Sequence, residues 1–298
     1  HWGMANLPAL RSEAYITTLD DYRAKVWFEL VSTNLPSQGK RDYAKKWEDL
    51  DRTLLADGQF GGALNRSNFL KEIAANLKNQ TNDTIQSIKA ANDWVKKNMH
   101  WNKRQTYWSE NGLKDAFEKR NGSTADINLM LVALLREMGF NANPVILSTR
   151  SNGRFSKDYP LLSKFNGVVV HVAIRDKELL LDATDPIGKF GMLPFECLSG
   201  EGRLIAKQGK WISLKSTERK NRSITVNINI LPTGQYKGQI TQYFSGYSGV
   251  EERRKIASIG IEKFKNDLVK GNPDMQISDF EIINLDSTEN ALQIKLST

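Results

Sequence analysis

Hydrophobic positions recur at helical spacing along several stretches of the first half of the chain. They predict helices over residues 41–55, 68–77, 84–99 and 113–119, each with one apolar side. Glycine-rich or polar stretches separate these helices, as at residues 58–62 and 79–83. An alternating stretch over residues 22–31 predicts one strand before the first helix.

The most apolar segment of the chain, residues 124–138, is hydrophobic nearly all round the helix that it predicts. A helix of this kind is expected to be buried. Ser123 and Asp126 form an S-x-x-D capping pattern at its start, and Gly139 follows its end, where glycine is favoured.

Alternation with a period of two dominates the rest of the chain. It predicts strands over residues 144–148, 168–174 and 178–184, the last two joined into a hairpin by a turn at 176–177. Further strands are expected over 223–231, 235–244, 277–285 and 291–296, with a helix over 251–269. A buried helix followed by an antiparallel sheet is typical of an α+β fold.

The length of 298 residues favours more than one domain. We expect residues 1–80 to be the end of an N-terminal β domain plus a helical linker. Residues 81–200 are expected to form an α+β core, and residues 201–298 a C-terminal β-rich accessory domain.

Charge and composition exclude several classes of protein. The net charge is +8, but the basic residues come as short pairs and never as a block of five, which favours solvated helix faces over nucleic-acid binding. One cysteine, Cys197, and three histidines give no metal-site pattern, and no cofactor is expected.

Two observations bear on location. The longest apolar run, residues 129–135, is too short for a membrane span, and residues 1–4 lack the features of a signal peptide. We therefore expect a cytosolic chain, or a mature or cropped piece of an exported protein, without a transmembrane segment.

Candidate chemistry lies at the junctions of the middle region. The capped turn over residues 122–126 opens the buried helix, His171 lies on a predicted strand, and Asp182 follows on the partner strand. A helix start lowers the pKa of a thiol, an imidazole accepts its proton, and a carboxylate orients the imidazole. The spacing across the turn predicts a hydrogen bond between His171 and Asp182.

The G-x-x-x-D sequence of residues 122–126, the strand histidine and the L-L-D-x-T sequence of residues 180–184 strongly resemble the transglutaminase-like core of the papain-like superfamily. The resemblance covers about residues 81–200 and points to a bacterial subgroup in which β-rich domains of unknown function flank the core. It implies a papain-like fold and an exported, periplasmic or cell-envelope location. The family pattern G-x-C-x-D places the cysteine nucleophile at Thr124, the histidine at His171 and the aspartate at Asp182.

The departure from this pattern is the threonine at position 124. An alcohol is far less acidic than a thiol, and a β-branched side chain is restricted in χ1, so Thr124 is expected to act as a helix cap. We therefore predict a catalytically inactive protein with a degenerate triad. Such a protein would bind peptide, glycan-linked peptide or a peptidoglycan-like ligand, or serve as an envelope scaffold. The alternative is an active amide hydrolase or acyltransferase that uses Ser123 or Thr124 with His171 and Asp182.

Three further residues have possible roles. Trp101 and Trp108 precede the buried helix, in the region from which folds of this family draw an indole for the cleft wall. Cys197 lies far from any predicted helix start and is expected to be a buried, inert thiol.

Overall fold

The computed structural model describes residues 46–175, 177–270 and 275–298, and before them residues 3, 5, 6, 8–13, 16–24, 26, 28, 30 and 32–42. The chain forms two compact units. Unit 1 comprises residues 1–184 and 196–215, and unit 2 comprises residues 185–195 and 216–298. Residues 185–195 join unit 2 because the Tyr247 hydroxyl donates to the Leu193 carbonyl (2.8 Å). The three-part division expected from the sequence stays a prediction.

Most helices lie in the first half of the chain, and most strands follow them. The helices are α1 (Trp47–Ala56), α2 (Gly61–Asn65), α3 (Lys71–Lys78), α4 (Thr84–Asn98), α5 (Leu113–Lys119), α6 (Thr124–Glu137), α7 (Tyr247–Ile259) and α8 (Ile261–Val269). Short 3-10 turns are η1 (Leu19–Asp21), η2 (Asn68–Leu70), η3 (Arg150–Asn152), η4 (Leu162–Lys164) and η5 (Phe195–Cys197). The strands are β1 (Ser32–Leu35), β2 (Gly39–Asp42), β3 (His100–Trp101), β4 (Asn121–Gly122), β5 (Asn141–Leu147), β6 (Gly167–Ile174), β7 (Lys177–Leu181), β8 (Glu201–Leu204), β9 (Lys210–Ser213), β10 (Lys220–Ile230), β11 (Tyr236–Gly246), β12 (Asp279–Ile283) and β13 (Leu292–Ser297).

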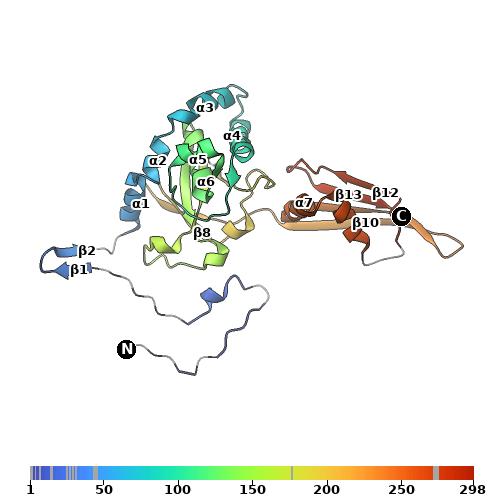
Figure 1. Ribbon diagram of the computed structural model, residues 1–298, viewed down its shortest axis with the longest axis horizontal. Coiled ribbons are helices and arrows are strands. Elements are labelled where there is room, and N and C mark those ends of the chain that lie inside the picture. Colours follow the sequence, from blue (N-terminus) through green and yellow to red (C-terminus); the bar gives the residue numbers. More distant parts are fainter. Residues whose placement is uncertain are drawn as a thin grey trace. The chain divides into compact units, whose positions relative to one another are not determined.

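Helix α6 is the centre of unit 1 (Figure 1). It packs against strands β5 and β6 and against helices α2 to α5. Side chains on every side of the helix are inaccessible to solvent, among them Ile127, Leu129 and Leu131. The predicted buried helix is therefore confirmed, and the α+β fold with it.

The main sheet of unit 1 has the order β7-β6-β5-β8-β9, with every neighbouring pair antiparallel. Strands β6 and β7 form the predicted hairpin, in which His171 pairs with Leu180. Strand β7 ends at Leu181, so Asp182 lies just beyond the ladder. A buried ion pair between Arg203 of β8 and Asp51 of α1 fixes that helix to the sheet.

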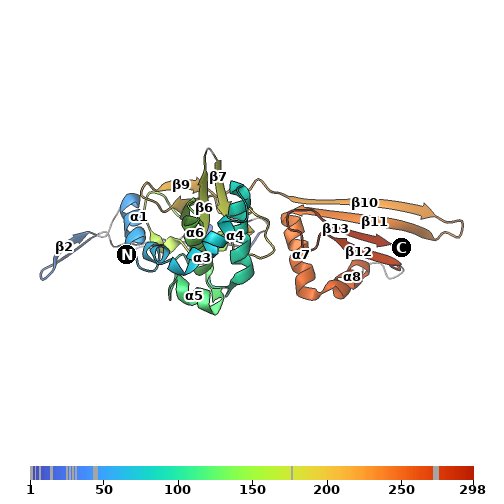
Figure 2. The same ribbon diagram turned by 90° about the horizontal axis from the view of Figure 1, so that it is seen from above.

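Unit 2 is a four-stranded antiparallel sheet of order β10-β11-β13-β12. Helices α7 and α8 cover one face of it (Figure 2), where Ile256 and Phe264 pack on Phe244, Leu292 and Ile294. The β-rich character expected for the C-terminal region is confirmed. Along edge strand β10, a row of side chains stays exposed: Ile224, Val226, Ile228 and Ile230.

The structure differs from the sequence-based expectation before residue 47. The helix expected from residue 41 begins at Trp47, because residues 39–42 pair with residues 32–35 in a hairpin. Tyr43, expected on the apolar side of that helix, is outside the described residues. The strand expected over 22–31 falls partly outside them too, and the residues of this stretch that are described do not lie in a strand.

Candidate functional site

The start of α6 is closed by its own side chains. The backbone N–H of Asp126 donates to Ser123 Oγ (3.2 Å), and the backbone N–H of Ser123 donates to Asp126 Oδ2 (2.8 Å). The Ser123 hydroxyl also donates to Asp126 Oδ2 (2.8 Å), while Ser109 Oγ donates to Asp126 Oδ1. The predicted capping box is therefore confirmed, and Ser123 is committed to it.

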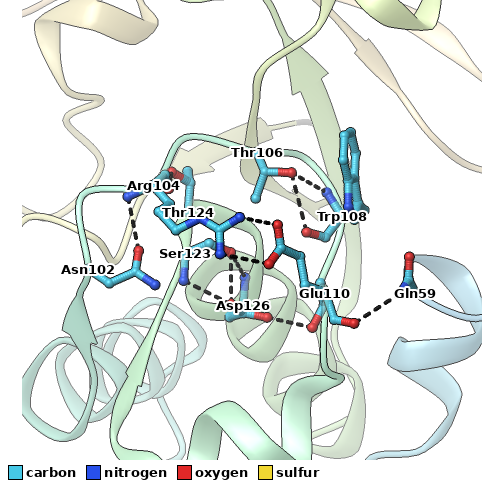
Figure 3. Close-up of polar contacts among 10 residues, drawn as sticks. Gln59, Asn102, Arg104, Thr106, Trp108, Glu110, Ser123, Thr124 and Asp126 are labelled. Atoms are coloured by element: carbon cyan, nitrogen blue, oxygen red, sulfur yellow. Dashed lines mark hydrogen bonds and ion pairs between the residues drawn. The ribbon is translucent and has the colours of Figure 1, made fainter.

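Thr124, the first residue of α6, is tied to the loop that precedes α5 (Figure 3). Its hydroxyl lies 3.0 Å from the carbonyl oxygen of Arg104 and 2.7 Å from Oε1 of Gln105, two acceptors for its single proton. Its backbone N–H donates to the same Arg104 carbonyl (3.0 Å). The Trp101 indole N–H is a further donor to that carbonyl (3.1 Å). Thr124 is thus a buried structural residue that fixes the loop to the helix.

Asp182 is held by α6 and by its own chain. Its Oδ2 accepts from Asn128 Nδ2 (2.9 Å), and its Oδ1 accepts from the backbone N–H of Thr184 (2.8 Å) and from the Thr184 hydroxyl. Asn128 also donates to the Val168 carbonyl (2.8 Å), and its Oδ1 accepts from the backbone N–H of Ala183 (2.9 Å). Burial raises the pKa of Asp182, and the hydrogen bonds from Thr184 and Asn128 oppose that shift.

The hydrogen bond predicted between His171 and Asp182 is wrong. Both ring nitrogens of His171 are buried and lack a hydrogen-bond partner among the described residues. A charged group, the carboxylate of Glu178, lies beside the ring, with its Oε1 3.5 Å from His171 Nε2. Burial lowers the pKa of His171, and the Glu178 carboxylate partly offsets this effect.

His171 also lies far along α6 from Thr124. Val168 of β6 accepts a hydrogen bond from Asn128, one turn after Thr124. His171 pairs instead with Asn143 of β5, whose Oδ1 accepts from Arg136 in the last turn of α6 (2.9 Å). Residues 128 and 136 are roughly 12 Å apart along a helix axis. The structure therefore does not bring His171 and Thr124 together, and at the Thr124 end β6 begins with Gly167 and Val168.

The two remaining candidate residues, Cys197 and Trp108, lie in a buried and a partly exposed position, respectively. Cys197 is buried and free, and burial together with the carboxylates of Asp182 and Glu196 holds the pKa of its thiol well above the usual range. The predicted buried thiol is confirmed. Trp108 packs edge to face on Tyr107, with the ring centres 4.6 Å apart, and keeps 39% of its surface exposed.

A polar cavity of about 310 Å³ lies beside the capped helix start. The Arg104–Glu110 ion pair and the Lys119–Asp115 ion pair contribute to its wall, as does the amide of Asn102. The loop that forms its rim is fixed to the body of unit 1 by Gln59, which accepts from the Ser109 N–H and donates to the Glu110 carbonyl (both 2.9 Å). We call this space the α6 cavity.

Several residues of this arrangement were not foreseen from the sequence. Arg104 and Gln105 contact Thr124 from an irregular loop about twenty residues earlier in the chain, and no periodic pattern reveals this contact. Asn128 did leave a signal, because it is a polar residue four positions after Thr124 on a helix that is otherwise apolar on that side. Its hydrogen bond to Asp182 links the start of α6 to the residue that follows β7.

The described part of the chain lacks two kinds of feature. No group of three or more His, Cys, Asp or Glu side chains is placed there to hold a metal ion. Among the helices described, none has the length and apolar character that crossing a membrane requires.

Comparison with known proteins agrees with this fold. Residues 71–177 match the family model described as the transglutaminase-like superfamily. These residues span α3 to the start of β7 and include the capped start of α6. The chain thus carries a transglutaminase-like core, as the sequence motifs predicted.

One solved structure is similar to the chain, and no curated protein matches it. It is a crystal structure described as a "putative protease" from Parabacteroides distasonis. The two chains share 11% sequence identity, and the TM-score is 0.44. The similarity covers 91% of this chain but only 56% of the other, so this chain spans little more than half of that protein's length.

Proposed function

We propose that this protein is a transglutaminase-like protein without catalytic turnover, whose α6 cavity binds peptide or glycan-linked peptide. The observation that carries the proposal is the pair of hydrogen-bond acceptors around the Thr124 hydroxyl. Its hydroxyl, at the position where the family has its nucleophile, is oriented by the Arg104 carbonyl and the Gln105 amide oxygen.

Neither acceptor is a base that could activate an alcohol. A hydroxyl becomes a nucleophile when an adjacent group of suitable pKa removes its proton. A carbonyl and a primary amide do not do this near neutral pH, and the imidazole of His171 lies beside the opposite end of α6. The hydroxyl of Ser123 is engaged with Asp126 in the capping box, which leaves it no free role as a nucleophile.

The α6 cavity supports ligand binding by its composition. Its wall combines positive and negative side chains with the amides of Asn102, Asn111 and Asn121. A peptide backbone offers N–H donors and C=O acceptors in alternation, and a glycan offers hydroxyls that do both. Such a wall can satisfy either kind of group, whereas a purely apolar ligand would remove water from its charged and amide groups without offering them hydrogen bonds.

We further propose that the protein is bacterial and works in the periplasm or cell envelope. The support is the resemblance of its motifs to exported members of the subgroup. If no peptide binds in the experiment below, the result favours a scaffold role without a ligand.

The experiment is calorimetric titration of the protein with a peptidoglycan stem tetrapeptide, free and disaccharide-linked. We expect saturable binding without cleavage, weakened about tenfold (about 1.4 kcal/mol) by Lys119→Gln, which removes one cation from the cavity wall. Lys114→Gln is the matched control, because Lys114 lies on the same helix, pairs with Glu118 and is not part of the wall. Binding that neither substitution changes would contradict the proposed site, and release of a cleaved product would contradict the absence of turnover.

A further inference from the structure

Strand β10 forms an open edge of unit 2. It is the outermost strand of the β10-β11-β13-β12 sheet, and all eleven of its residues are exposed. Its ladder with β11 runs through residues 220–230 without a bulge, and no strand of the described chain pairs with its other side. Helix α7 contacts the start of this hairpin, and the rest of β10 runs past the helices (Figure 2).

The register of the ladder decides which backbone groups of β10 point away from the sheet. At its two ends, the Leu231 N–H donates to the Gln235 carbonyl (2.7 Å) and the Tyr247 N–H donates to the Arg219 carbonyl (3.2 Å). In an antiparallel ladder, residues that bond to the neighbouring strand alternate with residues whose N–H and C=O groups face the other way. The odd-numbered residues therefore bond to β11, and the even-numbered residues of 222–230 direct these groups outward.

The exposed apolar side chains of β10 occupy the same even-numbered positions. Between 48% and 80% of the surface of each residue in this row is exposed: Ile224, Val226, Ile228 and Ile230. The ladder places the row on the face of the sheet that carries Phe244 of the core. Open backbone groups beside apolar side chains are the features by which a further strand is added to a sheet edge.

Proteins usually protect an edge strand by charges, prolines, bulges or short length. Residues 223–231 contain no charged residue, no proline and no glycine. The opposite edge of the same sheet, β12, is five residues long and carries Asp279 and Glu281. Of the two edges of this sheet, β10 is therefore the one suited to receive a strand.

We propose that β10 pairs in antiparallel orientation with β10 of a second copy of this chain. A two-fold axis at Asn227 places Ile224 opposite the partner's Ile230, and Val226 opposite the partner's Ile228. All of these positions are even-numbered, so each pair directs its N–H and C=O groups at the other strand. The two apolar rows then lie side by side on one face of a continuous sheet.

The sequence of β10 favours a second copy as the partner. A two-fold contact sets a surface against itself, so like charges in it would face each other, and residues 223–231 contain none. On the other face of the sheet, Thr225 meets the partner's Asn229, and Asn227 meets its own equivalent. The association also stops at two copies, because both edges of the combined sheet are then β12.

The contact is small, which determines its expected strength. Residues 223–231 span about 30 Å, and with a sheet about 10 Å thick the contact covers about 300 Å² on each copy. A standard stable interface covers about 800 Å² on each partner. We therefore expect a reversible dimer with a dissociation constant on the order of 100 μM.

The test is sedimentation equilibrium of the whole chain over roughly 5–500 μM, a range that brackets this constant. We expect a monomer–dimer equilibrium. Ile228→Lys should weaken it at least about tenfold, because it places an ammonium among the apolar side chains of the contact. Ile261→Lys is the matched control, because it makes the same change at an exposed isoleucine of α8, outside β10.

Two further variants test the backbone pairing and its register. Ile228→Pro removes an outward N–H and keeps the N–H groups that bond to β11, so it should weaken the dimer while the unfolding midpoint is retained. Asn227→Cys in the Cys197→Ser background should form a disulfide-linked dimer when diamide oxidises the thiols, because residues 227 of the two copies lie about 4.5 Å apart between Cα atoms. Thr225→Cys, which faces the partner's Asn229, should not.

A chain that stays monomeric over this range would overturn the proposal, as would a dimer that Ile228→Lys leaves unchanged. Growth beyond two copies would contradict the closed pairing. Cross-linking of Thr225→Cys and not of Asn227→Cys would overturn the two-fold axis at Asn227. These measurements do not depend on ligand binding in the α6 cavity, whose residues belong to unit 1.

Discussion

Asn128 Nδ2 lies 2.9 Å from Asp182 Oδ2, and this hydrogen bond joins the first half of α6 to the end of the β6–β7 hairpin. Both side chains are buried, and the side chain that reaches the aspartate from α6 is an amide and not an imidazole. The aspartate of the predicted triad therefore has a structural role in this protein.

Removing that amide should destabilise unit 1. Asn128→Ala leaves the Asp182 carboxylate with one fewer donor in a buried site, and we expect a loss of about 1–3 kcal/mol in the free energy of unfolding. Urea denaturation measures this loss. Asn98→Ala is the control, because the Asn98 side chain donates to the Trp94 carbonyl within its own helix, α4, and is partly exposed. Equal losses for the two variants would contradict the structural role of Asn128.

The ion pair between Arg203 and Asp51 should behave as a buried unit. Both side chains are less than 5% exposed, and the guanidinium contacts the carboxylate through two nitrogens. Asp51→Ala should cost about 3–5 kcal/mol, because it removes the buried partner of the Arg203 guanidinium and leaves it the exposed Glu48 carboxylate at 4.0 Å. The double variant Asp51→Leu/Arg203→Met should recover most of that loss in the same denaturation experiment. A double variant as unstable as the single one would show that the pair itself stabilises the fold.

The buried imidazole of His171 should make the fold sensitive to mild acid. Because burial lowers its pKa below 6.5, the folded state binds fewer protons than the unfolded state, and stability falls as the pH drops below about 6.5. His171→Leu should remove this contribution, so its urea midpoint should fall less than that of the wild type between about pH 7.5 and pH 5.5.

Glu178→Gln serves as the companion variant for that measurement. The Glu178 carboxylate raises the pKa of His171, so its neutralisation should make the acid loss larger. Lys210, which pairs with Glu178 and lowers the pKa of His171, is left in place. A smaller acid loss in Glu178→Gln than in the wild type would contradict this explanation.

A cysteine at position 124 should be tuned by the helix start and not by His171. In Thr124→Cys/Cys197→Ser, the dipole of α6 should lower the thiol pKa modestly from about 8.5. Adding His171→Ala should leave that pKa unchanged, because His171 lies beside the other end of the helix. The pH dependence of iodoacetamide alkylation gives both values.

Gly167→His tests the same geometry in the opposite direction. Residue 167 lies at the Thr124 end of β6, and an added Cβ there meets only ordinary contacts at 3.5 Å or more. In the Thr124→Cys background, an imidazole at this position should depress the thiol pKa further, since a cation near a thiolate stabilises it. A thiol pKa at position 124 that changes with His171→Ala and not with Gly167→His would show that His171, and not residue 167, lies beside the start of α6.

The fold was largely predictable because its signals are local. The apolar stripes of α4 and α6 and the capping box at Ser123 are set by residues within a few positions of one another, and they appear where the periodicity predicts them. The start of α1 was predicted six residues too early, because the pairing of residues 39–42 with residues 32–35 overrides helical propensity there.

The site was less predictable because it depends on contacts between distant segments. Asp182 lies eleven positions after His171, but the ladder pairs His171 with Leu180 and ends at Leu181. Besides Thr184, Asp182 has a donor in Asn128 of α6, 54 residues earlier in the chain. The acceptors of the Thr124 hydroxyl likewise lie in an irregular loop, whose path the sequence pattern does not define.

The central claim, that Thr124 is a structural residue and no nucleophile, is tested most directly by covalent labelling of the wild-type protein. The protein is incubated with a fluorophosphonate probe near neutral pH, and its intact mass is measured before and after peptide mapping. We predict no adduct on Thr124 or Ser123, because both hydroxyls are held in structural hydrogen bonds and the imidazole of His171 lies beside the other end of α6. An adduct on either residue that disappears in His171→Ala would contradict the account and establish an active hydrolase or acyltransferase.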